Sequence, residues 1–512
     1  MKKKLPKSGE IYTYYIEELE KYGAFQILKV EGKSVCYVSL DCLTDHLPPK
    51  EEALGWKPLY WERYSYHHRM DIGIIELTPF PPSYQCLGEL PLVTEKSSKD
   101  FFGRRWPDGS AYVSEIRWKS FDEEVTAAYK KYVNSGEDVI IHGKTFPKRL
   151  NVLQDDLYRH LNEQNSLGQF PCIYVARVEG FSQKLLKLIK TAPLLTRLEL
   201  KNPGVSVLDL RGTGLEDMEL DITGVKRLYL PERVRGLVLY GNIEPELIID
   251  DSACDEKQPP IFLRISLKKA QVSRFGMQKL RVKKLVLYDI LEIDVAEAAK
   301  CFPNLRELRM KGCPGIVKNM KMLGRFEELQ ILSLEELFGF GMEFLEGIVQ
   351  LPVLRDLSCE SIPKDVGMEI KRQWKGKIDI LSVTKLRDED WLKENLDNPI
   401  RHWDGSEFIP PAAYKKAFQC YKDAKRQLSE AVNRQEILHI VQAYTEQFNL
   451  LNEKYEEFIE TEEREDIFIA MKQLYEVCLL KRFSEGDIVS ENALNITLEE
   501  IYDAMDEVRG DW

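Results

Sequence analysis

Four short segments in the middle of the chain decide its fold: LRELRM (Leu305–Met310), LQILSL (Leu329–Leu334), LRDLSC (Leu354–Cys359) and IDILSV (Ile378–Val383). A fifth copy, VKKLVL (Val282–Leu287), precedes them. The central apolar residues of the five copies are spaced 23, 24, 25 and 24 residues apart, at Leu285, Leu308, Leu332, Leu357 and Leu381. Each copy predicts one short strand whose alternate apolar side chains point inward. The segments between copies, such as FLEGIVQL, have helical spacing.

The same pattern occurs earlier in the chain with a shorter spacing. Its copies are LTRLEL (Leu195–Leu200), LEDMEL (Leu215–Leu220), VKRLYL (Val225–Leu230) and VRGLVL (Val234–Leu239). The apolar centres lie nine or ten residues apart, at Leu198, Leu208, Met218, Leu228 and Leu237. Ten residues can form a strand and a turn but no helix. Repeats of these lengths resemble leucine-rich repeats, so residues 151–385 are predicted to form an irregular leucine-rich-repeat solenoid.

The flanking regions have different patterns, and together they predict an α+β multidomain protein. Residues 1–150 are predicted to be a β-rich domain, and residues 386–512 an acidic α-helical bundle. The predicted strands are Glu10–Tyr15, Ala24–Val30, Ser34–Leu40 and Ala111–Trp118, followed by a helix at Phe121–Val133. The predicted bundle helices are Pro411–Asn433, Gln435–Phe458, Glu462–Arg482 and Thr497–Val508, after a linker or irregular cap at 386–410.

The charge of this 512-residue chain is concentrated at one end. The net charge is −12, and residues 451–512 alone hold 18 acidic and 6 basic residues. The rest of the chain is therefore neutral. The absence of an excess of basic residues disfavours nucleic-acid binding, and the acidic carboxyl-terminal segment favours a basic partner. No apolar run is long enough to span a membrane. The ten cysteines form no C-x-x-C pair and are predicted to be free thiols in a reducing, cytoplasmic setting.

Motifs for catalysis or cofactors are nearly absent from the sequence. The segment GEDVIIHGKT (Gly136–Thr145) lacks the glycine spacing of a phosphate loop, and His67 and His68 would face opposite sides of a strand. We therefore predict no cofactor, no metal site and no catalytic residue. The run EEFIETEERED (Glu456–Asp466) is open to three interpretations: a solvated face, an acidic partner-binding patch at Glu456, Glu460 and Glu463, or a carboxylate site.

The repeats offer the best-motivated binding surface. Residues that flank the inward leucines are predicted to lie on one concave sheet face, where tyrosine and arginine are typical of binding hot spots. The candidate partner-binding residues on that face are Arg227, Tyr229, Tyr240, Lys284, Tyr288, Arg309 and Lys311.

The N-terminal segments Gly9–Tyr12 (GEIY) and Lys21–Leu28 (KYGAFQIL) resemble the immunity protein 26 family of bacterial polymorphic toxin systems. The resemblance covers about 110 residues, roughly a fifth of the chain. The repeats are outside that family's pattern, but they resemble leucine-rich-repeat proteins found beside toxin genes. The resemblance implies a bacterial antitoxin that binds and occludes a cognate toxin, with no catalytic residues of its own.

Three functions follow as hypotheses. The first is a cytoplasmic immunity protein, monomeric when free, whose partner is a basic toxin and neither nucleic acid nor membrane. The second is an enzyme that reverses a toxin's modification through a carboxylate or metal site in the helical bundle. The third is a leucine-rich-repeat scaffold for another protein partner, which would use the same face.

Overall fold

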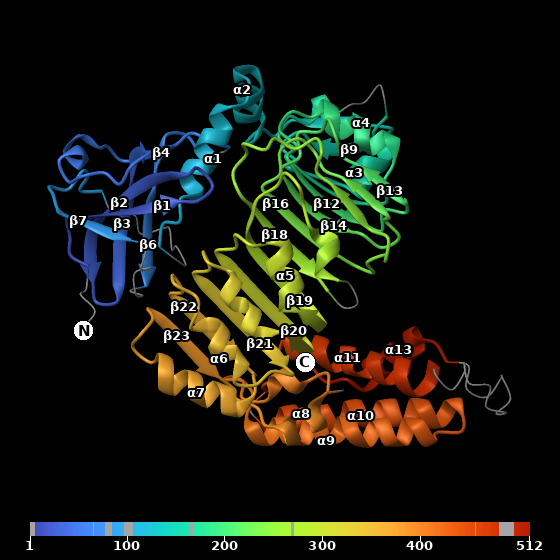
Figure 1. The fold of residues 1–512 in the computed structure, drawn as a ribbon. Helices are drawn as coiled ribbons and strands as arrows, with labels where there is room; N and C mark the ends of the chain where they lie inside the picture. The colour runs from blue at the N-terminus through green and yellow to red at the C-terminus, as the bar shows by residue number, and fades with distance from the viewer. Residues whose placement is uncertain are drawn as a thin grey trace. The chain divides into compact units, whose positions relative to one another are not determined.

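The computed structural model describes residues 6–64, 66–76, 84–96, 106–162, 167–267, 271–396, 398–455, 457–480 and 496–512. The chain divides into two compact units, Met1–Leu386 and Arg387–Trp512. The first unit contains an antiparallel sheet and a large parallel sheet, and the second unit is helical (Figure 1). Within the described ranges, no helix is both long enough and apolar enough to cross a membrane.

The first unit begins with a five-stranded antiparallel sheet in the order β6-β3-β2-β1-β7. Its strands are β1 (Glu10–Ile16), β2 (Lys21–Glu31), β3 (Ser34–Thr44), β6 (Ile72–Glu76) and β7 (Gln85–Glu89). Along the chain, β3 and β6 are connected by the 3-10 helix η1 (Glu52–Gly55) and a two-stranded ribbon of β4 (Tyr60–Trp61) and β5 (Arg69–Met70). Both faces of the sheet are buried. One face packs in a largely aromatic cluster around Phe25, and the other face packs in a mainly aliphatic cluster around Val38. The three strands predicted at its start are confirmed.

A strand was predicted at Ala111–Trp118, and this prediction is wrong. The segment is helix α1 (Ser110–Lys119), followed by the predicted helix, α2 (Glu123–Tyr132). Helical spacing places Tyr112 and Glu115 on one side, where both are buried. The Tyr112 hydroxyl donates to the Ala24 carbonyl at 2.9 Å, and the Glu115 carboxylate accepts from the Glu62 amide at 3.0 Å. These tertiary contacts override the strand propensity of the segment.

The second part of this unit is an eleven-stranded sheet, hereafter the long sheet, in which every neighbouring pair is parallel. Its central apolar residues form a register column: Leu285, Leu308, Leu332, Leu357 and Leu381 are direct neighbours across successive strands. The strands, in spatial order, are β10 (Val152–Gln154), β11 (Val175–Glu179), β12 (Arg197–Lys201), β14 (Asp217–Asp221), β16 (Gly236–Tyr240), β18 (Ile261–Ser266), β19 (Val282–Asp294), β20 (Glu307–Lys318), β21 (Ile331–Phe338), β22 (Asp356–Glu360) and β23 (Ile380–Thr384).

The chain returns between the carboxyl-terminal strands through helical segments. Figure 1 shows α5, α6 and α7 along one face of the long sheet. Their buried side chains and the leucine column belong to one core. The return segments are η3 (Val272–Phe275), α5 (Val295–Cys301), η4 (Met320–Arg325), α6 (Glu343–Ile348) and α7 (Lys364–Trp374). The helical spacing seen in the sequence between these strands is confirmed.

In the amino-terminal half the chain returns through strands instead. A second parallel sheet has the order β13-β15-β17, with strands β13 (Val207–Asp209), β15 (Arg227–Tyr229) and β17 (Ile248–Asp250). Leu208, Leu228 and Ile249 are register neighbours in this second sheet. Strands ten residues apart therefore alternate between two sheets. The elements before this region are β8 (Asp138–Ile141), β9 (Lys144–Pro147), α3 (Asp155–His160), η2 (Leu167–Gln169) and α4 (Gln183–Thr191).

The second unit packs its helices around a core that includes Trp403 and Phe448. Its elements are α8 (Glu389–Asn395), η5 (Arg401–Trp403), α9 (Pro411–Glu430), α10 (Arg434–Lys454), α11 (Thr461–Leu474), the π-helix η6 (Tyr475–Leu480) and α13 (Leu498–Val508). The predicted helices at 411–433, 435–458 and 497–508 match α9, α10 and α13. The predicted helix Glu462–Arg482 matches α11 and η6 up to Leu480, and its last two residues lie outside the described residues.

Candidate partner-binding surface

The long sheet has one face that its return segments leave uncovered, and we call it the open face. A single register row across this face contains Glu219, Val238, Arg264, Val286 and Arg309 from successive strands. All five side chains are exposed or half-buried, while their neighbours along each strand are buried. Because side chains alternate along a strand, the leucines fill the core and these residues face solvent.

The open face is hollowed where β16, β18 and β19 meet. The hollow has a volume of about 650 Å³ and is lined by Glu219, Val238, Tyr240, Gly241, Asn242, Ile243, Arg264, Ser266, Tyr288 and Asp289. The Arg264 guanidinium carbon lies 4.5 Å from the centre of the Tyr288 ring, which is a cation–π contact. On the floor, the Ser266 hydroxyl donates to Asp289 at 2.9 Å.

Burial affects both tyrosines of the hollow. It raises the pKa of Tyr240 to about 12, with nearby Asp221 adding to the effect. It also raises the pKa of Tyr288, although the charge of Arg264 opposes this shift. Both rings therefore present neutral hydroxyl groups at physiological pH. An aromatic body with a polar tip is the side-chain type that dominates protein interfaces.

Arg264 differs from four other cations of the open face. Arg177 and Arg197 both pair with Glu199, Arg309 pairs with Glu307, and Lys311 pairs with Glu335. Arg264 is exposed and forms no ion pair with any described residue. A guanidinium stacked on an aromatic ring with its donors free is suited to bind carboxylate or carbonyl groups of a partner.

The structure brings together only part of the predicted surface. Tyr240 and Tyr288 line the hollow, and Lys284 lies on the same face in β19. Arg309 and Lys311 extend that face along β20, where their ion pairs measure 2.5 and 2.6 Å.

Arg227 and Tyr229 were predicted to share one face with Tyr240, and this placement is wrong. Both lie in β15 of the second sheet, whereas Tyr240 lies in β16 of the long sheet. Arg227 donates to the Tyr229 hydroxyl at 3.0 Å, and the Arg211 guanidinium stacks 4.0 Å from the Tyr229 ring. The prediction fails because a spacing of ten residues is half of one repeat, so consecutive copies lie in different sheets.

Arg264, the central residue of the hollow, lies in none of the repeat copies recognised in the sequence. Its strand, IFLRIS (Ile261–Ser266), alternates Ile261, Leu263 and Ile265 inward, but it lacks the leading leucine of the other copies. The 20 residues between Tyr240 and Ile261 also break the earlier spacing. Period-two alternation alone could have identified this strand.

The predicted acidic patch is partly engaged within its own unit. Glu460 is the N-cap of α11, and it forms a capping box with Glu463. The Glu460 amide donates to the Glu463 carboxylate at 3.1 Å. Glu456 lies outside the described residues. A capping box explains two of the three glutamates by local helix chemistry.

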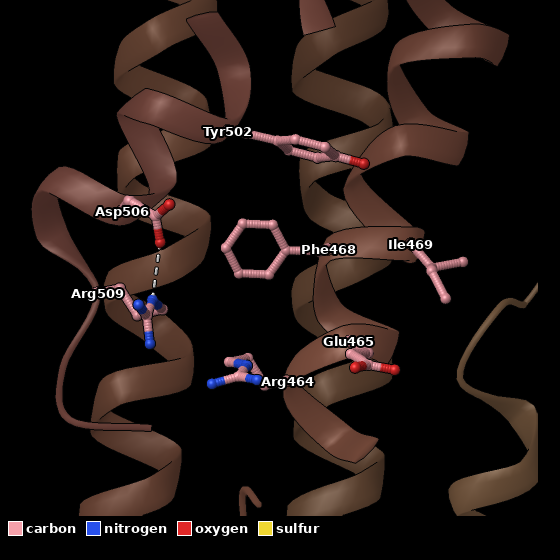
Figure 2. Close-up of a pocket in the computed structure, with 7 residues that line it drawn as sticks. All are labelled: Arg464, Glu465, Phe468, Ile469, Tyr502, Asp506 and Arg509. Carbon is pink, nitrogen blue, oxygen red and sulfur yellow. Dashed lines mark hydrogen bonds and ion pairs between the residues drawn. The ribbon is translucent and has the colours of Figure 1, made fainter. Parts of the chain in front are cut away.

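The helical unit has a groove of about 500 Å³ between α11 and α13 (Figure 2). The Phe468 and Tyr502 rings point toward each other across it, with their centres 5.4 Å apart. At one end Arg509 pairs with Asp506 at 2.9 Å, and Arg464 lies nearby. The groove mixes an apolar floor with charges of both signs. In the part of the chain that the structure describes, no group of three or more potential metal ligands occurs.

No protein-family model matches the sequence, no curated protein matches it, and no solved structure matches it.

Proposed function

We propose that this chain is a bacterial immunity protein that binds a cognate toxin through the open face and occludes it. The observation that carries the proposal is the hollow of Tyr240, Arg264 and Tyr288, which joins two half-buried aromatic rings to a cation without an ion pair. Tyrosine and arginine in a desolvated pocket are the usual anchors of protein interfaces. The proposal includes a leucine-rich-repeat architecture for the long sheet and a cytoplasmic location.

Two further features support the toxin as the kind of partner. The segments GEIY and KYGAFQIL, which resemble immunity protein 26, form parts of β1 and β2 in the antiparallel sheet. The acidic carboxyl-terminal residues would attract a basic toxin over long range and raise its association rate. In this proposal the helical unit steers the encounter and the open face makes the main contact.

Protection of bacteria from the toxin encoded beside the gene tests this function. Cells that express the toxin are expected to survive with the unaltered chain and to die with the Tyr240→Ala, Arg264→Ala double variant. The matched control is Tyr229→Ala with Arg227→Ala, which removes the same two residue types from the second sheet and is expected to protect. Equal protection by both double variants would contradict the assignment of the open face.

A titration of toxin activity with purified chain separates occlusion from the enzymatic alternative. Occlusion requires one chain for each toxin, so inhibition is expected to be complete near an equimolar ratio. Complete inhibition by a small fraction of an equivalent would show turnover and would contradict occlusion. A stoichiometric complex with a partner that is not toxic would favour the scaffold instead.

A further inference from the structure

Another cavity, which the proposed function does not use, lies beside the antiparallel sheet. It has a volume of about 420 Å³, within the size range of small-molecule sites. Five aromatic side chains contribute to its wall: Tyr14 from β1, Tyr37 from β3, Trp61 from β4, and Tyr66 and Trp106 from the connecting segments. Tyr66 is half-buried and Asp108 is exposed, so these two residues mark its mouth.

The aromatic wall is held in place by ring contacts behind it. Phe25 lies at the centre, with its ring 6.0 Å from Tyr14, 5.8 Å from Tyr37 and 5.8 Å from Trp106. Trp61 packs edge-on against Tyr66 at 4.6 Å. The cavity is therefore formed before any ligand arrives, which limits the entropy that binding would lose.

Asp71 is the buried carboxylate of this cavity and is only 6% exposed. Its backbone is fixed on both sides, since its amide donates to Leu59 at 2.9 Å and its carbonyl accepts from Ser39 at 3.0 Å. Among the described residues, no basic side chain forms an ion pair with Asp71. Burial raises the pKa of Asp71, although the Ser39 hydroxyl, Arg63 and the Trp61 indole oppose this shift.

The charges around the cavity favour a cation. Arg63 is the basic residue among the lining residues. Its guanidinium pairs with Glu115 at 2.8 Å and stacks 4.4 Å from the centre of the Trp61 ring, so the rings of Tyr14, Tyr37 and Trp106 are the ones proposed to contact a ligand. Asp71 and Asp108 then leave the lining with an excess of negative charge. Asp108 also accepts from the Ser110 amide at 3.1 Å, so a carboxylate already lies at the amino end of α1. Aromatic faces attract cations through their quadrupole, and a buried carboxylate without an ion pair adds to that attraction.

We propose that this aromatic cavity binds a small molecule carrying an alkylated ammonium group, with Asp71 as its counter-ion. The aromatic rings contact the alkyl groups and the carboxylate neutralises the charge. This inference is independent of the open face and of the toxin.

Calorimetric titration of the full chain with choline tests the proposal, and 3,3-dimethylbutan-1-ol serves as the probe of equal shape without charge. Choline is expected to bind with a dissociation constant of about 1 mM or tighter. The neutral probe is expected to bind at least about tenfold more weakly, because it lacks the cation–π and ionic attraction. Equal binding of the two probes, or no binding of choline, would overturn the proposal, and neither result depends on a variant.

Variants locate the binding in this cavity. Asp71→Asn keeps the size of the side chain and is expected to weaken choline binding about tenfold or more. Tyr66→Leu, at the mouth, is expected to weaken it less. Glu76→Gln removes a carboxylate from the exposed end of β6 and is the matched control, expected to leave binding unchanged. Choline binding that survives both cavity variants would place the ligand elsewhere and contradict the assignment.

Discussion

The two halves of the long sheet use the same inward leucines but return the chain differently. In the carboxyl-terminal half, strands from Leu285 to Leu381 are separated by about 24 residues and return through helices such as α5 and α6. In the amino-terminal half, Leu198, Met218 and Leu237 are 20 and 19 residues apart, and the chain returns through β13 and β15. The length of the return segment thus decides whether the opposite side of the core is helix or strand.

This difference determines which residues can share a surface. In the carboxyl-terminal half every strand copy contributes to the open face. In the amino-terminal half only alternate copies do, because the others belong to the second sheet. Tyr229 and Tyr240 are 11 residues apart, yet they lie on different sheets. A binding surface inferred from a repeat therefore requires the true period.

The largest expected effect concerns the core of the two halves. Leu308→Ala in β20 and Leu228→Ala in β15 each remove a side chain that is 0% exposed. Each substitution is expected to lower the free energy of unfolding of its unit by about 3 kcal/mol, since both leave a cavity. Urea unfolding followed by circular dichroism measures the loss.

Val207→Ala is the control for this pair. Val207 lies in β13 and is 49% exposed, so its truncation is expected to cost less than about 1 kcal/mol. If Leu228→Ala lowered the free energy of unfolding no more than Val207→Ala does, the second sheet would not be packed on the common core. The two halves would then not share the inward packing described above.

The sequence predicted the carboxyl-terminal half of the long sheet well because leucine occupies the central inward position of every copy. The register of Leu308, Leu332 and Leu357 follows directly from their spacing. The sequence predicted the amino-terminal half less well, because strands of the long sheet and of the second sheet have the same alternation of apolar and polar residues. Only the path of the chain between strands distinguishes the two sheets.

The candidate sites were predictable to a smaller extent. Tyr240 and Tyr288 could be found from their place beside inward leucines, whereas Arg264 was hidden in a strand without the leading leucine. The Asp71 cavity had no local signal, since its residues come from five separate segments of the first 111 residues. Helix α1 was misread for a similar reason, because the contacts of Tyr112 and Glu115 that favour a helix are made with distant residues.

A smaller effect is expected at the start of a helical return. Asp294 is the N-cap of α5, and its carboxylate accepts from the Ala296 amide at 2.8 Å and from the Asn319 side chain at 2.9 Å. Asp294→Ala is expected to lower the free energy of unfolding by about 1 kcal/mol. Thermal unfolding of the two proteins at the same pH measures this difference.

Asp209→Ala is the comparison variant from the strand-return half. The Asp209 carboxylate accepts from the Arg211 amide at 3.1 Å in a turn that precedes no helix. Asp209→Ala is expected to lower the free energy of unfolding less than Asp294→Ala does. A larger decrease for Asp209→Ala would mean that helix capping is not what stabilises the longer return segments.

The smallest expected effect is a pH dependence at Glu328, in the loop before β21. The Lys283 ammonium, at 2.7 Å, and the Arg306 guanidinium, at 3.2 Å, hold the pKa of Glu328 below its ordinary value. A carboxyl whose pKa is lower in the folded chain stabilises it above the unfolded pKa, and this contribution is lost as the pH falls through the folded pKa.

Glu328→Gln is therefore expected to be slightly less stable than the unaltered chain at neutral pH. The difference is expected to vanish in acid, as the pH falls through the lowered pKa of Glu328 in the folded chain. Urea midpoints across this pH range measure it. A difference that is constant with pH would show that the ion pairs contribute no charge-dependent stability.

The affinity of purified toxin for two matched tyrosine variants tests most directly the central claim that the open face of the long sheet is the binding face. Tyr240→Ala changes that face, and Tyr229→Ala changes the second sheet. Calorimetry is expected to show that Tyr240→Ala weakens binding about thirtyfold, as for an interface anchor, and that Tyr229→Ala binds like the unaltered chain. Loss of affinity with Tyr229→Ala while Tyr240→Ala binds normally would contradict the account.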